Sequence, residues 1–243
     1  MLNFEIVIPT TLTREEFDKT GAAICIRDIC NIYKSKTSGI KVTLNILFEN
    51  REGLSSVYAQ RLQTTKADYV ICMHDDFEVH DFFMFRKLIK AHEIYDIVGL
   101  AGASSQDYSN PESPPVWHRS CGRNEGRGIV GHYIPAEMGG FGYPYVNSVE
   151  FGPTPAPVVV IDGLFMSFRM DKVRPQLPIF DPQFTFHFYD LAAACNATRK
   201  GLTLGVWPIY GVHHGLGEYA HDETWQKLAV EFRAKHSQYK HSV

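Results

Sequence analysis

The sequence lacks the long apolar runs and the leader pattern of membrane and secreted proteins. No run of about 18 consecutive apolar residues occurs in the 243-residue chain, so no transmembrane helix is expected and any membrane contact would be peripheral. The opening letters, MLNFEIVIPT, have the pattern of a strand and not of a signal peptide. The chain therefore shows no sign of insertion into a membrane or of export.

Paired cysteines are lacking as well. The five cysteines are odd in number, and no two of them have C-x-x-C spacing. This pattern disfavours a disulfide framework and a structural zinc site, and it is typical of a reducing, cytoplasmic compartment. The cysteines are Cys25, Cys30, Cys72, Cys121 and Cys195.

Glycine-rich phosphate loops and excess positive charge are missing too. No Gly-x-Gly-x-x-Gly follows the first predicted strand and no Gly-x-x-x-x-Gly-Lys occurs, which disfavours dinucleotide oxidoreductases and P-loop nucleotidases. The net charge of −3 gives no overall electrostatic attraction for nucleic acid. With 44% hydrophobic and 21% charged residues and no internal repeats, the composition is that of an ordinary globular domain spanning residues 1–243.

Predicted strands and helices alternate over the first hundred residues. Apolar, β-branched runs predict strands, and apolar residues at helical spacing predict the helices between them. This alternation is the signature of a parallel, doubly wound α/β sheet. Strands are expected over residues 4–10, 41–48, 69–73 and 97–101, and helices over residues 13–33, 54–62 and 81–92, the first opened by a capping box at Thr13.

Residues 104–157 break the alternation. They contain eight of the 13 prolines and eight of the 19 glycines, with aromatic residues such as Trp117 between them. A long aperiodic insert of this kind is usually a binding loop or lid, and its aromatic content favours an ordered flap over a disordered excursion. Strands over residues 157–168 and 203–208 and a helix over about 222–238 complete the chain.

The stretch ADYVICMHDD carries the strongest indication of chemistry. The run 69–73 reads as a strand buried on both faces, yet it ends in His74, Asp75 and Asp76. Adjacent carboxylates are costly to desolvate, so a positive partner such as a divalent metal is expected there. The alternative is a solvated cluster that caps the next helix. Ligand binding is favoured, because open α/β sheets bind ligands at the carboxyl ends of their strands.

Two further clusters have the same character. His187 and Asp190 precede a predicted helix, and His213 and His214 lie in a glycine-bounded loop. Carboxylates with imidazoles suit Mn²⁺ or Mg²⁺ better than a thiolate-seeking metal. Each cluster has a simpler explanation. Asp190 would be an ordinary helix cap, and the histidines would be packed or loop residues.

Several motifs together make the chain similar to a known family. A first strand ending in Pro9-Thr10, a second ending in Glu49-Asn50, the pattern Asn-x-x-Gly-Leu-Ser and the stretch ADYVICMHDD resemble the GT-A glycosyltransferases of the family-2 type. VIDGLFM, FDxxFxFHFYD and VHHxxG are similar to the branch whose domain occurs in streptomycin-biosynthesis proteins. The resemblance covers residues 3–215 and is weakest over 104–157.

The resemblance implies a fold and an activity. The fold would be a three-layer α/β/α sandwich with a central, mostly parallel mixed sheet. The activity would be inverting, Mn²⁺- or Mg²⁺-dependent transfer of a sugar from a UDP- or GDP-sugar to the hydroxyl of a saccharide, lipid-linked or small-molecule acceptor. The alternatives are sugar transfer to a modified nucleobase in DNA, nucleotidyl transfer, and a non-catalytic nucleotide- or sugar-binding module.

The resemblance also implies roles for individual residues. In an Asp-x-Asp triplet the third position binds the metal, and here the triplet has become His74-Asp75-Asp76. The implied roles are donor binding by Pro9, Thr10, Glu49, Asn50, His74 and Asp75, acceptor binding by Asp162, Gly163 and Trp117, metal binding by Asp76 with His213 or His214, and general base catalysis by Asp190 assisted by His187.

Overall fold

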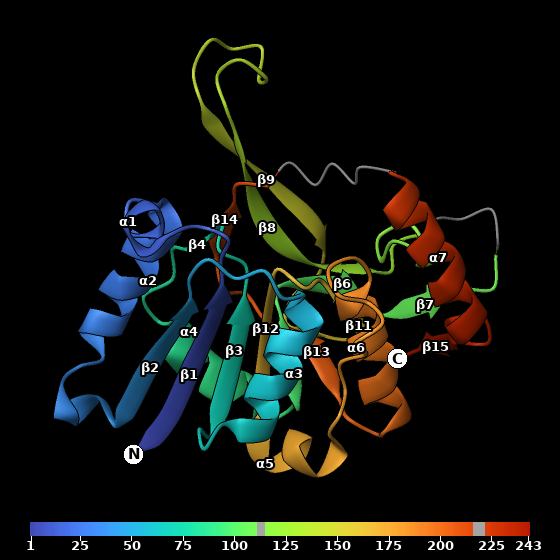
Figure 1. Ribbon diagram of the computed structural model, residues 1–243, viewed down its shortest axis with the longest axis horizontal. Coiled ribbons are helices and arrows are strands. Elements are labelled where there is room, and N and C mark those ends of the chain that lie inside the picture. Colours follow the sequence, from blue (N-terminus) through green and yellow to red (C-terminus); the bar gives the residue numbers. More distant parts are fainter. Residues whose placement is uncertain (111–114, 216–221) are drawn as a thin grey trace.

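A seven-stranded mixed sheet forms the middle of the molecule (Figure 1). The computed structural model describes residues 1–110, 115–215 and 222–243. The strand order is β10-β13-β5-β12-β3-β1-β2, in which only β12 and β10 run antiparallel to their neighbours. The strands are β1 (Leu2–Pro9), β2 (Ile40–Leu47), β3 (Tyr69–Met73), β5 (Ile97–Gly99), β10 (Ala156–Val158), β12 (Phe165–Arg169) and β13 (Leu204–Val206).

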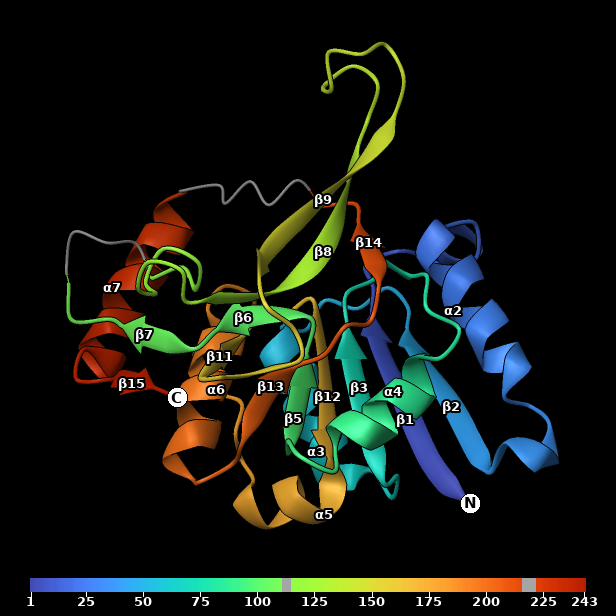
Figure 2. The ribbon, with the colours of Figure 1, turned by 180° about the vertical axis from the view of Figure 1, so that it is seen from behind.

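Helices cover both faces of this sheet. Figure 1 shows α3 and α6 on one face, and Figure 2, from behind, shows α2 and α4 on the other. This arrangement confirms the predicted three-layer α/β fold with a mostly parallel mixed sheet. The helices are α1 (Arg14–Phe17), α2 (Gly21–Ile32), α3 (Leu54–Thr64), α4 (Met84–Ala91), α5 (Met170–Val173), α6 (Tyr189–Arg199) and α7 (Glu223–His236), with 3₁₀ turns η1 (Lys36–Ser38) and η2 (Arg174–Gln176).

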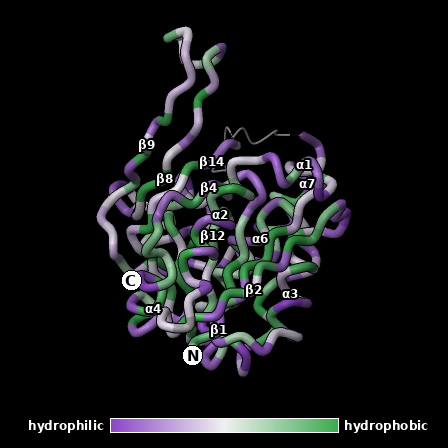
Figure 3. Tube along the Cα trace, turned by 90° about the vertical axis from the view of Figure 1, so that its left-hand side faces the viewer, coloured by the Kyte–Doolittle hydropathy of each residue, from purple (hydrophilic) through white to green (hydrophobic). Residues whose placement is uncertain are grey.

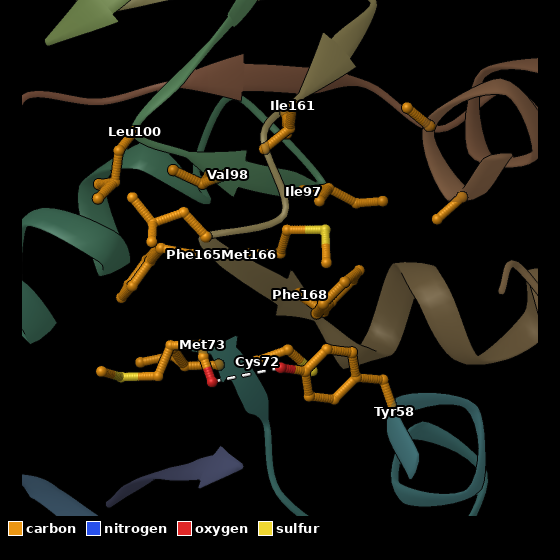
Figure 4. Packing of buried hydrophobic residues seen from close by; sticks show 14 of the residues in the cluster. Tyr58, Cys72, Met73, Ile97, Val98, Leu100, Ile161, Phe165, Met166 and Phe168 are labelled. Carbon is orange, nitrogen blue, oxygen red and sulfur yellow. Dashed lines mark hydrogen bonds between the residues drawn. The ribbon is translucent and has the colours of Figure 1, made fainter. Parts of the chain in front are cut away.

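The core lies between the sheet and these helices, because strands covered on both faces are apolar throughout. Figure 4 shows Tyr58 of α3 beside Phe168 of β12 and Cys72 of β3. The Tyr58 hydroxyl donates a hydrogen bond to the carbonyl of Met73, at 3.2 Å, so its polar atom is satisfied although the ring is fully buried. Each such side chain stabilises the fold by roughly 1.5–3 kcal/mol.

Several predicted elements differ from the structure. The helix predicted over 13–33 is two helices, α1 and α2. A short strand, β4 (Phe77–Val79), follows the 74–76 triplet, and the helix predicted from Asp81 begins only at Met84. Phe82, which lies within the predicted helix, precedes α4 in the structure and is 57% exposed. The cause is local: Asp81 accepts hydrogen bonds from the backbone N–H of Phe83 and from Lys87, and this turn delays the helix.

The sheet also departs from a simple succession of parallel strands. β5 is not the neighbour of β3, because the antiparallel strand β12 lies between them. Late strands cannot be assigned a place in the sheet from periodicity alone, since the pairing partners are far apart in the chain. The single strand predicted over 157–168 is in fact three: β10, β11 (Val160–Ile161) and β12.

The insert 104–157 is more regular than predicted. Its strand β8 belongs to a second sheet of order β11-β6-β8-β14-β4, and β8 and β9 form a long hairpin that projects from the body (Figure 3). Residues 111–114 of the insert, and Gly217 of the VHHxxG motif, lie outside the described residues. The remaining strands are β6 (Ala101–Ala103), β7 (Ser105–Asp107), β8 (Gly126–Ile134), β9 (Tyr145–Gly152), β14 (Gly211–His213) and β15 (Lys240–Ser242).

Candidate functional site

Strand pairing brings the first and last polar clusters together. β14 runs antiparallel to β4 with His213 opposite Phe77, and the backbone N–H of His214 donates to the carbonyl of Asp76 at 3.0 Å. The imidazole of His213 therefore lies beside the carboxylate of Asp76, with 3.3 Å between Nε2 and Oδ2. Residues 137 positions apart in the chain become neighbours at the carboxyl end of β3.

The antiparallel strand β12 brings the middle cluster to the same place. Because Phe165 pairs with Met73, β12 begins where β3 ends, and the loop 162–164 before it lies against the 74–76 triplet. A hydrogen bond of 3.1 Å from the backbone N–H of His74 to the carbonyl of Leu164 joins the two. The position of this strand, which periodicity did not predict, is what places Asp162 and Gly163 in the site.

A central cavity of about 440 Å³ opens at this edge of the sheet. Its volume is in the range of natural small-molecule sites. Of the predicted site residues, eight line it, contributed by five separate segments of the chain: His74, Asp76, Trp117, Asp162, Gly163, His187, Asp190 and His213.

One end of the cavity has a donor set suited to a metal. His74, Asp76 and His213 each offer a ligand atom within 4.8 Å of the others. The Oδ1 atom of Asp76 is buried and has no hydrogen-bond partner among the described residues, which is costly for a carboxylate oxygen and is relieved by a cation. Two imidazoles and a carboxylate suit a borderline or hard divalent ion, so these residues fit the expected metal.

The tautomer of His74 also suits a metal ligand. The hydroxyl of Tyr189 donates to the carbonyl of Gly163 at 2.8 Å, so it must accept the hydrogen bond from Nε2 of His74, also 2.8 Å long. The Nδ1 atom of His74 is then unprotonated and faces Asp76, 3.9 Å from Oδ1. Burial lowers the pKa of His74 below its ordinary value and keeps the ring neutral, as a ligand must be.

Asp76 and His213 form a charged pair. Burial opposes ionisation of both groups, but their hydrogen bond and mutual charge outweigh it. As a result the pKa of Asp76 lies below, and the pKa of His213 above, its ordinary value. A cation bound at Asp76 would replace the proton of His213 as the balancing charge.

Asp190 lines the same cavity. It lies in the first turn of α6, after Phe188, whose φ of 63° turns the chain into the helix. Its carboxylate accepts hydrogen bonds from the backbone N–H of Gly163 at 3.0 Å and of Leu191 at 2.8 Å. Burial, and secondly the charge of Asp162, raise the pKa of Asp190 to about 7. Asp190 thus accepts a backbone hydrogen bond in the first turn of α6, and its raised pKa also allows it to exchange a proton near neutral pH.

Gly163 allows the close approach that orients Asp190. A Cβ at this position would lie 2.2 Å from the Tyr189 hydroxyl and 3.0 Å from the Cβ of Asp190, so only glycine fits. Next to it, the carboxylate of Asp162 accepts hydrogen bonds from the indole N–H of Trp117, at 2.7 Å, and from the backbone N–H of Leu164. The predicted acceptor-side residues are therefore in contact with one another.

His187 and His214 stand apart from the partners predicted for them. His187 was predicted to assist Asp190. It lines the cavity but precedes α6, and within the described structure it shares no hydrogen bond with Asp190. Burial lowers the pKa of His187, against the charge of Asp222. The Nε2 atom of His214 lies 2.8 Å from Glu78 and not beside Asp76.

The predicted donor-binding residues of the first two strands lie outside the cavity lining. Pro9 ends β1, and the carbonyl of Thr10 accepts a hydrogen bond of 2.8 Å from the backbone N–H of Asn50. Glu49 is joined in the same way to Leu12, at 2.9 Å. These contacts hold the ends of β1 and β2 together. Asp75 is half-buried and also lies outside the lining.

Two ionisable side chains in the cavity lining, those of Tyr189 and His132, were not predicted from the sequence. Tyr189 joins His74 to Gly163, and its only sequence signal is its place beside Asp190. His132 of β8 pairs in register with His213, and their ring centroids are 5.8 Å apart. The alternation of β8 would have pointed to His132, but glycines at 126, 128 and 131 hide that pattern.

Comparisons with known proteins assign the chain to a family. A family model described as "Glycosyltransferase like family" matches residues 17–241. No curated protein matches the chain. One solved structure, "Crystal Structure of A197 from STIV", aligns with a TM-score of 0.43 and 10% identity over 86% of this chain and 82% of that one, a likeness too weak to support an argument. Because the family match spans nearly all of the sequence, the protein belongs to this glycosyltransferase-like family.

Proposed function

We propose that the central cavity transfers a sugar, with inversion, from a nucleoside-diphosphate sugar to an acceptor hydroxyl, with the help of a divalent cation. The observation that carries the proposal is the presence in one cavity of both a metal-type group and a carboxyl group whose pKa is raised to about 7. Inverting transfer needs both: charge stabilisation at the leaving phosphates and a base for the incoming hydroxyl.

The donor end is built on His74, Asp76 and His213. A Mn²⁺ or Mg²⁺ ion held by these residues would neutralise the diphosphate leaving group. Their fit rests on the partnerless Oδ1 of Asp76 and the unprotonated Nδ1 of His74. Thr10 and Asn50, at the neighbouring strand ends, are proposed to contact the nucleotide of a UDP- or GDP-sugar, together with Pro9, Glu49 and Asp75.

The acceptor end is built on Asp190. In its ionised form the carboxylate takes the proton of the acceptor hydroxyl, and the hydrogen bond from Gly163 fixes its orientation. Burial, and secondly the charge of Asp162, raise the pKa of Asp190 to about 7, and a general base is most effective when its pKa lies near the working pH. Trp117 and His187 line the same end and are proposed to position the acceptor. A saccharide, lipid-linked or small-molecule acceptor suits this pocket, and a modified nucleobase in DNA is the alternative.

A donor screen tests the proposal. The full chain is incubated with Mn²⁺ and a panel of UDP- and GDP-sugars, and released nucleoside diphosphate is measured with and without chelator. Metal-dependent release from at least one donor is expected. Donor binding without turnover would favour a non-catalytic module, and release of pyrophosphate from a nucleoside triphosphate and a sugar phosphate would favour a nucleotidyltransferase. Either result would contradict the proposal.

A further inference from the structure

A second group of metal-type ligands lies outside the central cavity. It consists of Cys25 on α2, Glu78 on β4 and His80 just after β4. The sulfur, one carboxylate oxygen and one imidazole nitrogen all lie within 4.8 Å of one another. None of the three lines the cavity, and none has a role in the proposed sugar transfer.

Glu78 is the centre of this group. Its Oε2 atom lies 2.9 Å from Nε2 of His80, and its Oε1 atom lies 2.8 Å from Nε2 of His214. The Glu78 side chain is only 17% exposed. Among the described residues its ion pairs are with histidines alone, so no permanently charged lysine or arginine balances the carboxylate.

The N-terminal end of α2 packs against the carboxylate of Glu78. A Cβ at Gly21, the first residue of α2, would lie 1.7 Å from Oε1 of Glu78, so the absence of a side chain lets the helix end approach. Cys25 is one turn further along the same face of α2, which places its sulfur over the Glu78 carboxylate. The cysteine is half-buried and forms no disulfide.

A thiolate, an imidazole and a carboxylate form a donor set that is typical of zinc, and the thiolate discriminates against Mg²⁺ and Mn²⁺. We propose that Cys25, Glu78 and His80 bind a zinc-class divalent cation, with a fourth position open to water or an external ligand. His214 donates to the second oxygen of Glu78 and orients it, as outer partners of metal ligands do. The cysteine spacing gives no sign of this site, because the other two ligands come from a distant strand.

A cation at this site would link α2 to β4, close to the metal-type group of the cavity. The cation would fasten α2 to β4 only two residues after Asp76, and His214, the neighbour of His213, holds the same carboxylate. The two metal groups would then differ in ion preference. The cavity group has no sulfur ligand and the second group has one.

Co²⁺ is the probe that tests this proposal, because cobalt bound to a thiolate shows a charge-transfer band in the near ultraviolet. The full chain is freed of metal and titrated with Co²⁺. We expect one equivalent to give the thiolate band and stoichiometric Zn²⁺ to remove it. Cys25→Ser should abolish the band, and His80→Asn should weaken Co²⁺ binding at this site more than about tenfold.

Two variants serve as controls. Cys30→Ser changes another half-buried cysteine of α2, and Asp76→Asn changes the cavity group. Both should keep the band. The proposal is overturned if the wild-type chain shows no thiolate band, if the band survives Cys25→Ser, or if it is lost in either control. Should Cys25→Ser fail to fold, unaltered Co²⁺ binding in His80→Asn, whose side chain is 41% exposed, would overturn it as well.

Discussion

The Nε2 atom of His74 donates a hydrogen bond of 2.8 Å to the hydroxyl of Tyr189, and this contact joins the metal-type group to the segment that carries the candidate base. His74 belongs to the metal-type group, whereas Tyr189 precedes Asp190 at the start of α6. The tyrosine hydroxyl itself donates a hydrogen bond to the carbonyl of Gly163. One hydroxyl thereby fixes the tautomer of a candidate metal ligand and the loop that orients the candidate base.

Tyr189→Phe should therefore weaken metal binding without removing a ligand. Loss of the hydroxyl frees the His74 ring to rotate and to change tautomer, and losses of outer partners typically cost about 10–100-fold in metal affinity. Titration with Mn²⁺, followed by electron paramagnetic resonance, measures the change. Tyr143→Phe, at an exposed tyrosine of the β8–β9 connection, is the matched control. Equal Mn²⁺ affinity in Tyr189→Phe and the wild type would show that the hydroxyl does not orient His74.

Gly163→Ala should disrupt both ends of the cavity at once. The new Cβ would lie 2.2 Å from the Tyr189 hydroxyl, so the ring or the loop must move and the contacts to His74 and Asp190 are lost. Overpacking of this kind costs about 1–3 kcal/mol in the free energy of unfolding. Thermal unfolding and a turnover assay would measure the two losses. Gly39→Ala is the control for a glycine substitution without overpacking, because nothing lies within 4 Å of a Cβ at position 39. Its φ of 71° adds only backbone strain. A fully active, equally stable Gly163→Ala protein would contradict the geometry.

The pH dependence of turnover should report Asp190. A base must be ionised, so kcat/KM should rise with pH through about 7, the value to which burial and the charge of Asp162 raise the pKa of Asp190. Asp162→Asn removes the second cause and should shift this rise to lower pH. Asp171→Asn, at an exposed carboxylate paired with Arg169, should leave the profile in place. An unshifted rise in Asp162→Asn would mean that another group controls it.

Stability should reveal the same group independently of activity. The pKa of Asp190 is about 7 in the folded chain against an ordinary value of 3.8, so the folded state binds this proton more tightly than the unfolded state. The free energy of unfolding of the wild type should therefore fall as pH rises from about 4 to about 7, because Asp190 loses a proton that the folded state binds more tightly. Asp190→Asn has no such proton, so this contribution is absent from the variant. The difference in Tm between variant and wild type should grow in favour of the variant over that window. A difference that is constant with pH would contradict the raised pKa.

Most of the helices of the first hundred residues, and the strands β1, β2, β3 and β5, could be predicted from the sequence, because buried parallel strands are nearly pure apolar runs. The short strand β4 was not predicted. The position of β12 in the sheet could not be predicted from the sequence. Its apolar run is readable, but whether it lies beside β3 or at the sheet edge depends on pairing between residues about 95 positions apart, such as Phe165 and Met73. The β8–β9 hairpin was missed because glycines at 126, 128 and 131 obscure the alternation of β8.

The candidate site was predicted in part for a related reason. Asp76 follows β3 and Asp190 begins α6, so the edge of the central sheet predicts their proximity. His213 reaches Asp76 from β14 of the second sheet. His214 was equivalent to His213 in the sequence. Only the register of β14 against β4 turns one histidine toward Asp76 and the other toward Glu78. Tyr189 acts through two hydrogen bonds to distant residues, which no local pattern encodes.

The most direct test of the central claim compares donor binding with turnover in Asp76→Asn and Asp190→Asn. Binding of the best donor from the screen is measured by calorimetry in the presence of Mn²⁺, and turnover is measured as released nucleoside diphosphate. We expect Asp76→Asn to lose metal-dependent donor binding. Asp190→Asn should bind donor almost as the wild type does while its kcat falls by about 10²–10⁴-fold. Normal turnover in Asp190→Asn, or undiminished Mn²⁺-dependent donor binding in Asp76→Asn, would contradict the account.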